Sequence, residues 1–172
     1  NIANYPFCTI DPNVGIVEVP DERVDKLAEL SKSRKKVPAI VEFYDIAGLI
    51  RGAHQGAGLG NQFLSHIRET NAILVVLRCF TNNEIIHSEG SVDPIRDLET
   101  INIELAMKDL ETVSKRLSSL EKELKSGSKD AIKERGILTK IKSSLSSNLI
   151  ITEFADEPFI KNLGLLSAKK RI

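Results

Sequence analysis

Apolar residues near the start of the chain fall into two short runs that predict β-strands. Residues 14–20 (VGIVEVP) alternate weakly and end in proline, and residues 37–45 (VPAIVEFYD) are rich in β-branched and apolar side chains. The segment between them, PDERVDKLAELSK, begins with proline and an acidic first turn. Its apolar residues recur at helical intervals, at Val24, Leu27 and Leu30. The pattern therefore predicts a short helix inserted between two strands.

A glycine-rich stretch separates the second predicted strand from a second helix. Residues 44–63 (YDIAGLIRGAHQGAGLGNQF) contain five of the ten glycines of the chain. An apolar face of Phe63, Leu64 and Ile67 predicts the helix. Residues 72–80 (AILVVLRCF) are nearly continuously apolar, as in a central strand of a parallel sheet that is covered on both faces. Strand, loop, helix and strand together predict a right-handed βαβ unit.

The hydrophobic period changes after Asp93 and Pro94, which predict a helix start with an aspartate cap and a proline in the first turn. The helix is expected to end near Lys125, before the breaker SGS at 126–128, and a second helix is expected from about Lys129 to Leu145. Apolar positions spaced four and three apart form a stripe on the first helix, namely Ala106, Leu110, Val113, Leu117, Leu120 and Leu124. A matching stripe on the second helix consists of Ala131, Leu138, Ile141 and Leu145.

These stripes predict an antiparallel helical hairpin that projects from the sheet. The simpler alternative is that both helices cover the sheet in the ordinary way, but their heavily charged outer faces favour a projecting arm. Near the C-terminus, DEPFIKNL predicts a short helix, and LLSAKKRI is compatible with the start of another strand. The expected fold class is α/β with an inserted helical arm.

Composition narrows the function classes only a little. The chain has 24 basic and 24 acidic side chains, so net charge does not indicate a general nucleic-acid or membrane partner, although direct nucleic-acid binding stays possible. The basic run at residues 32–36 is interpreted as a solvated loop. Cys8 and Cys79 lie far apart and indicate neither a disulfide framework nor a zinc site. No apolar run is long enough to span a bilayer, so a cytoplasmic location is the default expectation.

The glycine-rich loop follows a buried strand, where ligands of α/β proteins usually bind. Asp45 ends the strand and could hold a hydrated magnesium ion through water. Gly48 would let its backbone N–H approach a terminal phosphate, which a side chain would block. An ordinary turn at the end of a strand is the alternative, because two matching positions in four arise often by chance.

A threonine in an upstream loop strengthens the phosphate hypothesis. Thr9 lies in an extended, proline-flanked segment just before a strand, where its hydroxyl could join a magnesium shell. Taken alone, such a threonine is more often a hydrogen-bonding turn residue. Together, Thr9 before one strand and Asp45 with Gly48 after the next match the two switch loops of a phosphate-sensing NTPase.

Three longer segments carry a resemblance to a known family. NYPFCTIDPN, DIAGLIRGAHQGAGLGNQFL and GSVDPIRDLETINIEL resemble the YchF/Obg-like ATPases, a branch of the translation-factor-related P-loop GTPases, nearly residue for residue. The resemblance implies an incomplete Ras-like P-loop NTPase sheet with an inserted antiparallel coiled-coil arm. It also implies hydrolysis of ATP or GTP with Mg²⁺ and association with ribosomes (50S or 70S).

The resemblance assigns roles to residues of the glycine-rich loop and of the upstream loop. Thr9 corresponds to the switch-I magnesium threonine, Asp45 to the aspartate that holds magnesium through water, and Gly48 to the glycine that senses the terminal phosphate. Leu49 stands where many GTPases have a glutamine that orients the attacking water, and the family has a hydrophobic residue there. His54 could be recruited instead, although a solvent-facing loop histidine is the commoner case.

The chain departs from a complete P-loop NTPase in its motifs. It contains no Gly-Lys pair, so the phosphate-binding loop is expected in the reading frame within about 30 residues upstream of Asn1. The base-recognition motif and a TGS-type domain are expected downstream, and the chain alone is expected to be inactive. The expected division is 1–92 for the NTPase part with both switches, 93–147 for the coiled-coil insertion and 148–172 for the return to the NTPase part. A non-catalytic module that binds a partner through the arm is the alternative.

Overall fold

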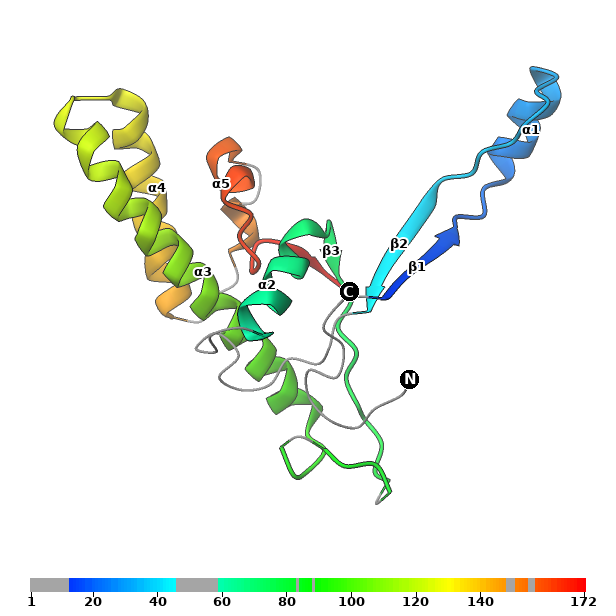
Figure 1. The fold of residues 1–172 in the computed structure, drawn as a ribbon, viewed down its shortest axis with the longest axis horizontal. Coiled ribbons are helices and arrows are strands. Elements are labelled where there is room, and N and C mark those ends of the chain that lie inside the picture. Colours follow the sequence, from blue (N-terminus) through cyan, green and yellow to red (C-terminus); the bar gives the residue numbers. More distant parts are fainter. Residues whose placement is uncertain (1–12, 46–58, 83, 88, 148–150, 155–156) are drawn as a thin grey trace.

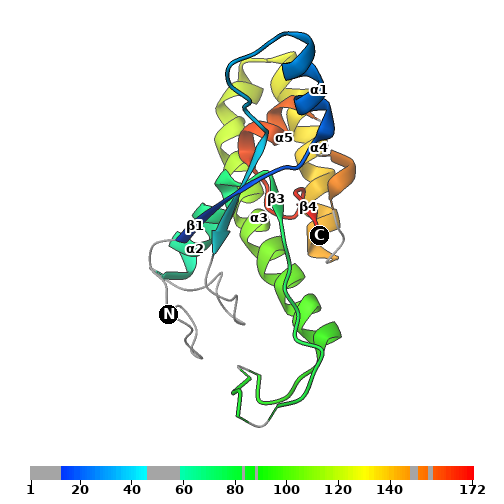
Figure 2. The same cartoon turned by 90° about the vertical axis from the view of Figure 1, so that its right-hand side faces the viewer.

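The computed structural model describes residues 13–45, 59–82, 84–87, 89–147, 151–154 and 157–172, with the side chains of 59–63 and 152 outside that description. Two long arms diverge from a central region that contains α2, β3 and the C-terminal end of the chain (Figure 1). One arm is a β-ribbon capped by a helix, and the other is a pair of helices. The view turned by 90° shows the long helix α3 running through most of the height of the molecule (Figure 2).

The ribbon consists of β1 (Asn13–Glu18) and β2 (Ile40–Asp45), which pair antiparallel with Asn13 opposite Asp45 and Glu18 opposite Ile40. At its outer end lies α1 (Glu22–Leu30), whose N-cap Asp21 accepts a hydrogen bond from the backbone N–H of Arg23. Every residue of both strands is exposed. The predicted strand, helix and strand are therefore confirmed, although neither face of the ribbon is covered by the described residues.

The central region is built from α2 (Leu59–Glu69), β3 (Ala72–Ile73) and β4 (Lys170–Arg171), and the two strands pair in parallel. Backbone bonds from Val75 to Ile172 and from Ile172 to Ile73 extend this pairing slightly. The expectation that LLSAKKRI begins a strand is therefore confirmed. Among the described residues β2 pairs only with β1 and β3 only with β4, so the predicted βαβ unit is not seen within one sheet.

The apolar run at 72–80 differs from its prediction. Only Ala72 and Ile73 form strand, and Leu74, Val76 and Phe80 are 56%, 87% and 59% exposed. A central strand needs backbone partners on both edges and cover on both faces. Within the described part of the chain, the strand next to it is the two-residue β4, which ends one residue before Ile172. Within the described residues β3 therefore has a partner strand on one edge, whereas a central strand needs one on each edge.

The helical arm agrees closely with the prediction. The first helix, α3, spans Pro94–Lys125, and its N-cap Asp93 accepts a hydrogen bond from the backbone N–H of Arg96. The second, α4, spans Lys129–Ser146, and its N-cap Ser128 accepts from the backbone N–H of Ala131. The turn between them includes Gly127 with φ of +76°, a left-handed conformation that favours glycine.

Apolar side chains along the predicted stripes hold the two helices together. The buried members are Ala106, Val113 and Leu120 on α3 and Ala131, Leu138, Ile141 and Leu145 on α4, with Leu110, Leu117 and Leu124 partly buried beside them. Each fully buried leucine contributes about 1.5–3 kcal/mol. Across the helix pair, the guanidinium of Arg116 donates two hydrogen bonds to the carboxylate of Glu134, at 2.7 and 2.8 Å. The residues at the predicted heptad positions therefore form the interface between α3 and α4.

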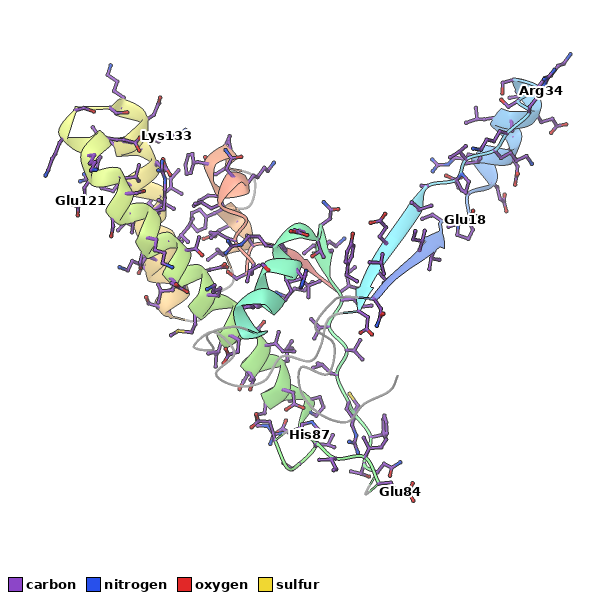
Figure 3. All side chains as sticks on the ribbon, viewed as in Figure 1. Glu18, Arg34, Glu84, His87, Glu121 and Lys133 are labelled. Atoms are coloured by element: carbon purple, nitrogen blue, oxygen red, sulfur yellow. The ribbon has the colours of Figure 1, made fainter. Side chains whose placement is uncertain are left out.

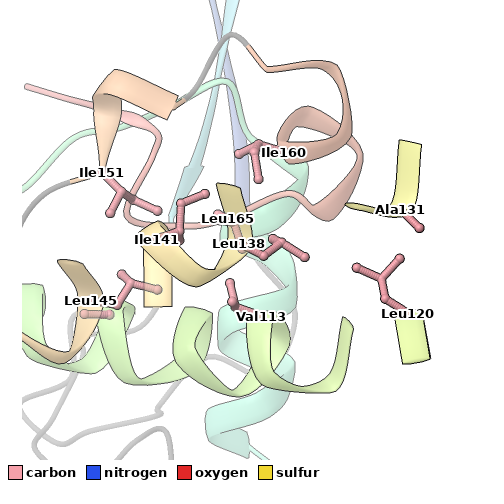
Figure 4. Packing of buried hydrophobic residues seen from close by; sticks show 10 residues of the cluster. Val113, Leu120, Ala131, Leu138, Ile141, Leu145, Ile151, Ile160 and Leu165 are labelled. Atoms are coloured by element: carbon pink, nitrogen blue, oxygen red, sulfur yellow. The ribbon is translucent and has the colours of Figure 1, made fainter. Parts of the chain in front are cut away.

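The segment after α4 packs back onto the arm. It contains a 3-10 turn, η2 (Thr152–Phe154), and the short helix α5 (Pro158–Leu163) that the sequence predicts. Ile151, Ile160 and Leu165 from this segment are buried in the same core as the arm helices (Figure 4). None of the helices in the described ranges is long and apolar enough to cross a membrane.

Candidate functional site

Asp45 is the one predicted site residue that lies among the described residues. It is the last residue of β2, at the end of the ribbon that faces the central region (Figure 1). Its side chain is exposed, and within the described part of the chain it has no hydrogen-bond or ion-pair partner. The carboxylate is accessible to a cation.

The other predicted site residues lie outside the described residues, namely Thr9, Gly48, Leu49 and His54. Their predicted roles therefore stay predictions. In the described ranges, no group of three or more His, Cys, Asp or Glu side chains could hold a metal ion. A hydrated magnesium ion needs no such group, because it keeps several waters and binds one or two carboxylates. An exposed carboxylate at the end of a strand fits that chemistry.

Helix α2 follows the glycine-rich loop directly and is anchored on its inner face. Leu64 and Ile67 are 1% and 4% exposed, and they pack with Leu105 of α3 and Leu166 before β4 in a small core. Two of the three residues of the predicted helical face are thus confirmed as buried. Helix α2 therefore contacts both the arm and the C-terminal segment.

The end of α2 is tied to the arm by Arg68. Its guanidinium donates a hydrogen bond to the hydroxyl of Thr112 on α3, at 3.2 Å. The aliphatic part of the same side chain lies over Gly164, where an added Cβ would be 3.0 Å from Cγ of Arg68. Gly164 also has φ of +60° as the C-cap of α5. A larger residue at 164 would therefore be strained and would displace Arg68.

A buried aspartate connects the arm to the segment that enters β4. Asp109 on α3 is 0% exposed and accepts hydrogen bonds from the backbone N–H groups of Leu166 and Ser167, at 2.8 and 2.7 Å, and from the Ser167 hydroxyl. Burial raises the pKa of Asp109, while the bonds from Ser167 and Leu166 and the positive charge of Arg68 oppose that shift. The Asp109 carboxylate therefore accepts hydrogen bonds from two buried backbone N–H groups that would otherwise need a backbone carbonyl as their acceptor.

Two partly buried cations surround this aspartate. Lys169 donates to the carbonyl of Thr70 at the end of α2, and Arg171 donates to the side chain of Asn102 on α3. Burial lowers the pKa of both Lys169 and Arg171, and the charge of Asp109 partly offsets it. We refer to Arg68, Asp109, Thr112, Ser167 and Lys169 as the junction, because they join α2, α3 and the start of β4.

The junction is not predicted from the sequence. One signal for it was present, since Asp109 lies directly before the seam residue Leu110 and three residues after the buried Ala106. A charged residue on the apolar side of a helix indicates a buried polar contact. Its partner Leu166 lies 57 residues further along the chain, and no sequence pattern marks it as a partner of Asp109.

The two described histidines have structural contacts. The backbone N–H of Glu89 donates to Nδ1 of His87, so Nε2 carries the proton and donates to Asp97, at 3.0 Å. This contact fastens the loop before α3 to its first turn. Nε2 of His66 is buried and has no hydrogen-bond partner among the described residues.

The family comparison gives a match over most of the chain. Residues 1–122 match the family described as "50S ribosome-binding GTPase". The chain is 53% identical over 171 residues to the ribosome-binding ATPase YchF of Bacillus subtilis, which covers 97% of this chain and 47% of that protein. It is 47% identical over 171 residues to Obg-like ATPase 1 of Oryza sativa subsp. indica, and this match covers 96% of this chain and 43% of that protein.

A solved structure gives the same result for the fold. The YchF GTPase of Schizosaccharomyces pombe superposes with a TM-score of 0.69 at 43% identity, over 99% of this chain and 48% of that one. The paired helices α3 and α4 and the mixed α/β part therefore have the YchF arrangement. The chain spans about half the length of the curated relatives it matches.

Proposed function

The chain belongs to the YchF/Obg-like family of ribosome-binding ATPases, and from that premise we propose that it supplies the switch and arm part of a nucleotide-driven switch. In this proposal the protein hydrolyses ATP or GTP with magnesium in the cytoplasm and associates with ribosomes. The observation that carries the proposal is 53% identity to a ribosome-binding ATPase over nearly the whole chain. Residues 1–92 and 148–172 would form the nucleotide-binding part and 93–147 the arm.

The proposed nucleotide site is formed by two loops. Asp45 would hold magnesium through water, and its position as an exposed carboxylate at the end of β2 supports that role. The hydroxyl of Thr9 would complete the oxygen ligands, and the backbone N–H of Gly48 would donate to the terminal phosphate. When bound, magnesium neutralises the charge that develops on the phosphates during transfer.

Water positioning would not use the usual glutamine. Leu49 has an aliphatic side chain, which neither donates nor accepts a hydrogen bond, so it can exclude solvent but cannot orient the attacking water. His54, five residues further along the same loop, is the candidate for that role, since imidazole titrates near neutral pH. A Leu49→Gln variant is expected to increase turnover only if glutamine can take over the positioning.

The junction provides a route from the nucleotide to the arm. Ordering of Gly48 around a terminal phosphate would reposition α2, because α2 follows the same loop. Arg68 and Thr70 at the end of α2 contact Thr112 on α3 and Lys169 before β4. Loss of the phosphate would release α2 and change the support of the arm, so ribosome affinity would depend on nucleotide state.

The test uses the protein translated from the whole reading frame. Hydrolysis of ATP and of GTP is measured with and without Mg²⁺, and co-sedimentation with 50S and 70S particles is measured with a non-hydrolysable analogue and with diphosphate. The proposal expects magnesium-dependent hydrolysis and ribosome binding that differs between the two nucleotide states. Ribosome binding without hydrolysis would instead support a non-catalytic arm module, and absence of both would refute the proposal.

The isolated 172-residue chain provides a second check. It contains no Gly-Lys pair, and the phosphate cradle of a P-loop NTPase depends on one. Isothermal titration with Mg-ATP is therefore expected to show no binding in the micromolar range. Micromolar binding by this chain would place the cradle within these residues.

A further inference from the structure

The arm and the segment that follows it are held together as one body. Leu165 of that segment lies in the same buried core as the side chains of α3 and α4. The carboxylate of Asp109 on α3 also accepts three buried hydrogen bonds, from the backbone N–H groups of Leu166 and Ser167 and from the Ser167 hydroxyl. Hydrogen bonds to a carboxylate are stronger than those between neutral groups. We call α3, α4 and the described residues from 151 to 169 the arm body, and we expect its parts to move together.

Helix α2 is attached to the arm body by a smaller interface. Its buried side chains, among those that the structure describes, are Leu64 and Ile67, and they pack with one buried leucine of α3 and one before β4. The core inside the arm body contains ten buried residues. Apolar contacts set much of the strength of an interface, so the boundary between α2 and the arm body is the weaker one. It lies well away from the outer end of the arm, which Glu121 and Lys133 mark in Figure 3.

The polar contacts described across this boundary gather at the C-terminal end of α2. The guanidinium of Arg68 donates to the hydroxyl of Thr112, at 3.2 Å. The ammonium group of Lys169 donates to the carbonyl of Thr70, where a cation is favourable because the carbonyl groups at a helix C-terminus carry partial negative charge. The other end of α2 follows the glycine-rich loop and lies about 16 Å away along the helix axis. If α2 moves as a rigid rod, a shift that starts at the loop has to break or re-form these contacts.

The contact of Lys169 depends on both sides of the boundary. Its backbone lies two residues after Ser167, which Asp109 fixes to α3. Burial lowers the pKa of Lys169, and the charge of Asp109 opposes that shift, whereas the charge of Arg68 adds to it. A partly buried ammonium group needs both an acceptor and a nearby negative charge. Asp109 supplies the charge, and the carbonyl of Thr70 supplies the acceptor while α2 is seated on the arm body.

We propose that Lys169, positioned by Asp109, is a latch that holds the C-terminal end of α2 on the arm body, and that this latch sets the preference of the protein for nucleoside triphosphate over diphosphate. The inference rests on the proposed function, in which the glycine-rich loop contacts the terminal phosphate. A contact that stabilises one position of α2 shifts the affinity for any ligand that favours another position. Asp109 and Lys169 are positioning residues, since they lie at the end of α2 opposite the loop.

The alternative is a purely structural role for Lys169. In that case the lysine satisfies the end of α2 equally well with either nucleotide bound. Its removal would then lower stability and leave the ratio of the two nucleotide affinities unchanged. The ratio, rather than stability or either affinity alone, therefore separates a latch from a structural contact.

The direct test uses the protein translated from the whole reading frame. Fluorescent ADP and a fluorescent non-hydrolysable ATP analogue are titrated with Mg²⁺ present, the guanine pair is run in parallel, and the ratio of the two dissociation constants is compared between variants. Lys169→Met keeps the length of the side chain and removes the ammonium group, so we expect this ratio to change by at least about threefold. Lys169→Arg keeps a cationic donor and is expected to stay within about 1.5-fold of wild type.

A double-mutant cycle tests whether Asp109 acts through Lys169. Asp109→Asn replaces one acceptor oxygen with an amide group and should change the ratio in the same direction as Lys169→Met. The double variant should show no further change, because both substitutions open the same latch. Additive changes, or changes in opposite directions, would overturn the inference. If Asp109→Asn does not fold by circular dichroism, Ser167→Ala replaces it in the cycle, since it removes one of the three hydrogen bonds to Asp109.

Two controls separate the latch from net charge and from stability. Lys170→Met removes the neighbouring cation, which is exposed and has no hydrogen-bond or ion-pair partner within the described ranges. Leu138→Ala lowers stability in the seam between α3 and α4, away from α2. Both variants are expected to keep the ratio within about 1.5-fold of wild type. A change in either control as large as that in Lys169→Met would contradict the latch.

The outcomes for wild type separate this inference from the proposed function. Wild type that binds and hydrolyses nucleotide, with an unchanged ratio in Lys169→Met, would leave the proposed function intact and overturn the inference alone. Wild type that binds neither nucleotide would refute the proposed function, and the inference with it. A changed ratio in Lys169→Met and Asp109→Asn, with both controls unchanged, supports the latch.

Discussion

At the scale of single residues, the buried hydrogen bonds of Asp109 are expected to contribute strongly to stability. Asp109→Ala would leave two buried backbone N–H groups, those of Leu166 and Ser167, without their acceptor. Each unsatisfied group costs about 1–3 kcal/mol, so we expect a loss of about 3 kcal/mol in the free energy of unfolding. Urea denaturation measures it. A loss below about 1 kcal/mol would show that water or a shifted group replaces the carboxylate.

The pH dependence of stability gives a separate prediction for Asp109. Burial raises the pKa of its carboxyl above the ordinary value of 3.8, so the folded chain binds this proton more tightly than the unfolded chain. Its contribution is therefore fully present below pH 3.8 and is lost as pH rises through the folded pKa. Relative to Asp109→Asn, wild type should lose stability over that range. A relative gain with rising pH would contradict the direction of the shift.

Glu111, two residues further along α3, should behave in the opposite way. Hydrogen bonds from Lys108 and Lys115 lower its pKa to about 2. Its contribution is present above pH 4.5 and is lost as pH falls toward 2. The side chain is 42% exposed, so solvent screens these pairs and Glu111→Gln should cost less than about 0.5 kcal/mol at pH 7. A cost above about 1 kcal/mol would indicate stronger coupling than an exposed pair provides.

Helix caps could be predicted from neighbouring residues, whereas the junction could not. Asp93 caps α3 at the position that the local sequence predicts, and this cap is confirmed, while Ser128 of the predicted breaker caps α4. Asp109 was visible only as a charge beside the apolar seam. Its partner Ser167 lies 58 residues away, and periodicity carries no information on such a contact.

At the scale of secondary-structure elements, the helical arm was the most predictable part, because its interface repeats every three or four residues. The prediction can be tested on α4 with two substitutions of the same kind. Leu138 is 0% exposed in the seam, so Leu138→Ala should lower the free energy of unfolding by about 2–5 kcal/mol. The control Ile132→Ala removes a side chain that is 50% exposed and should cost less than about 1 kcal/mol. Similar losses for the two would contradict the observed helix face.

Strand predictions depended more on neighbours than on the strand's own residues. The ribbon strands were predicted correctly, since β-branched runs and the flanking prolines and glycines are local signals. The run at 72–80 has the composition of a buried strand, but β3 extends only over Ala72–Ile73. The composition of a segment indicates whether its side chains suit a buried strand. Whether the strand forms also depends on backbone partners from segments that are distant in the sequence.

At the scale of the whole molecule, the proposed function depends on linking a nucleotide site to a distant arm. Among the described residues, α2 contacts both α3 and the segment before β4, which is the arrangement that the proposal requires. The candidate site was predicted from motif spacing, and Asp45 is the part of it that the structure describes. The remaining site residues, Thr9, Gly48, Leu49 and His54, lie outside the described ranges, so their geometry stays a prediction.

The most direct measurement of the central claim is nucleotide hydrolysis by the whole-reading-frame protein carrying Asp45→Ala. Its control is Glu42→Ala, which removes another exposed carboxylate from the same strand. If Asp45 holds magnesium through water, Asp45→Ala lowers magnesium-dependent turnover by about 10- to 100-fold or more while the thermal midpoint stays within about 2 °C of wild type and Glu42→Ala stays active. Unchanged turnover in Asp45→Ala, or an equal loss in Glu42→Ala, would contradict the account.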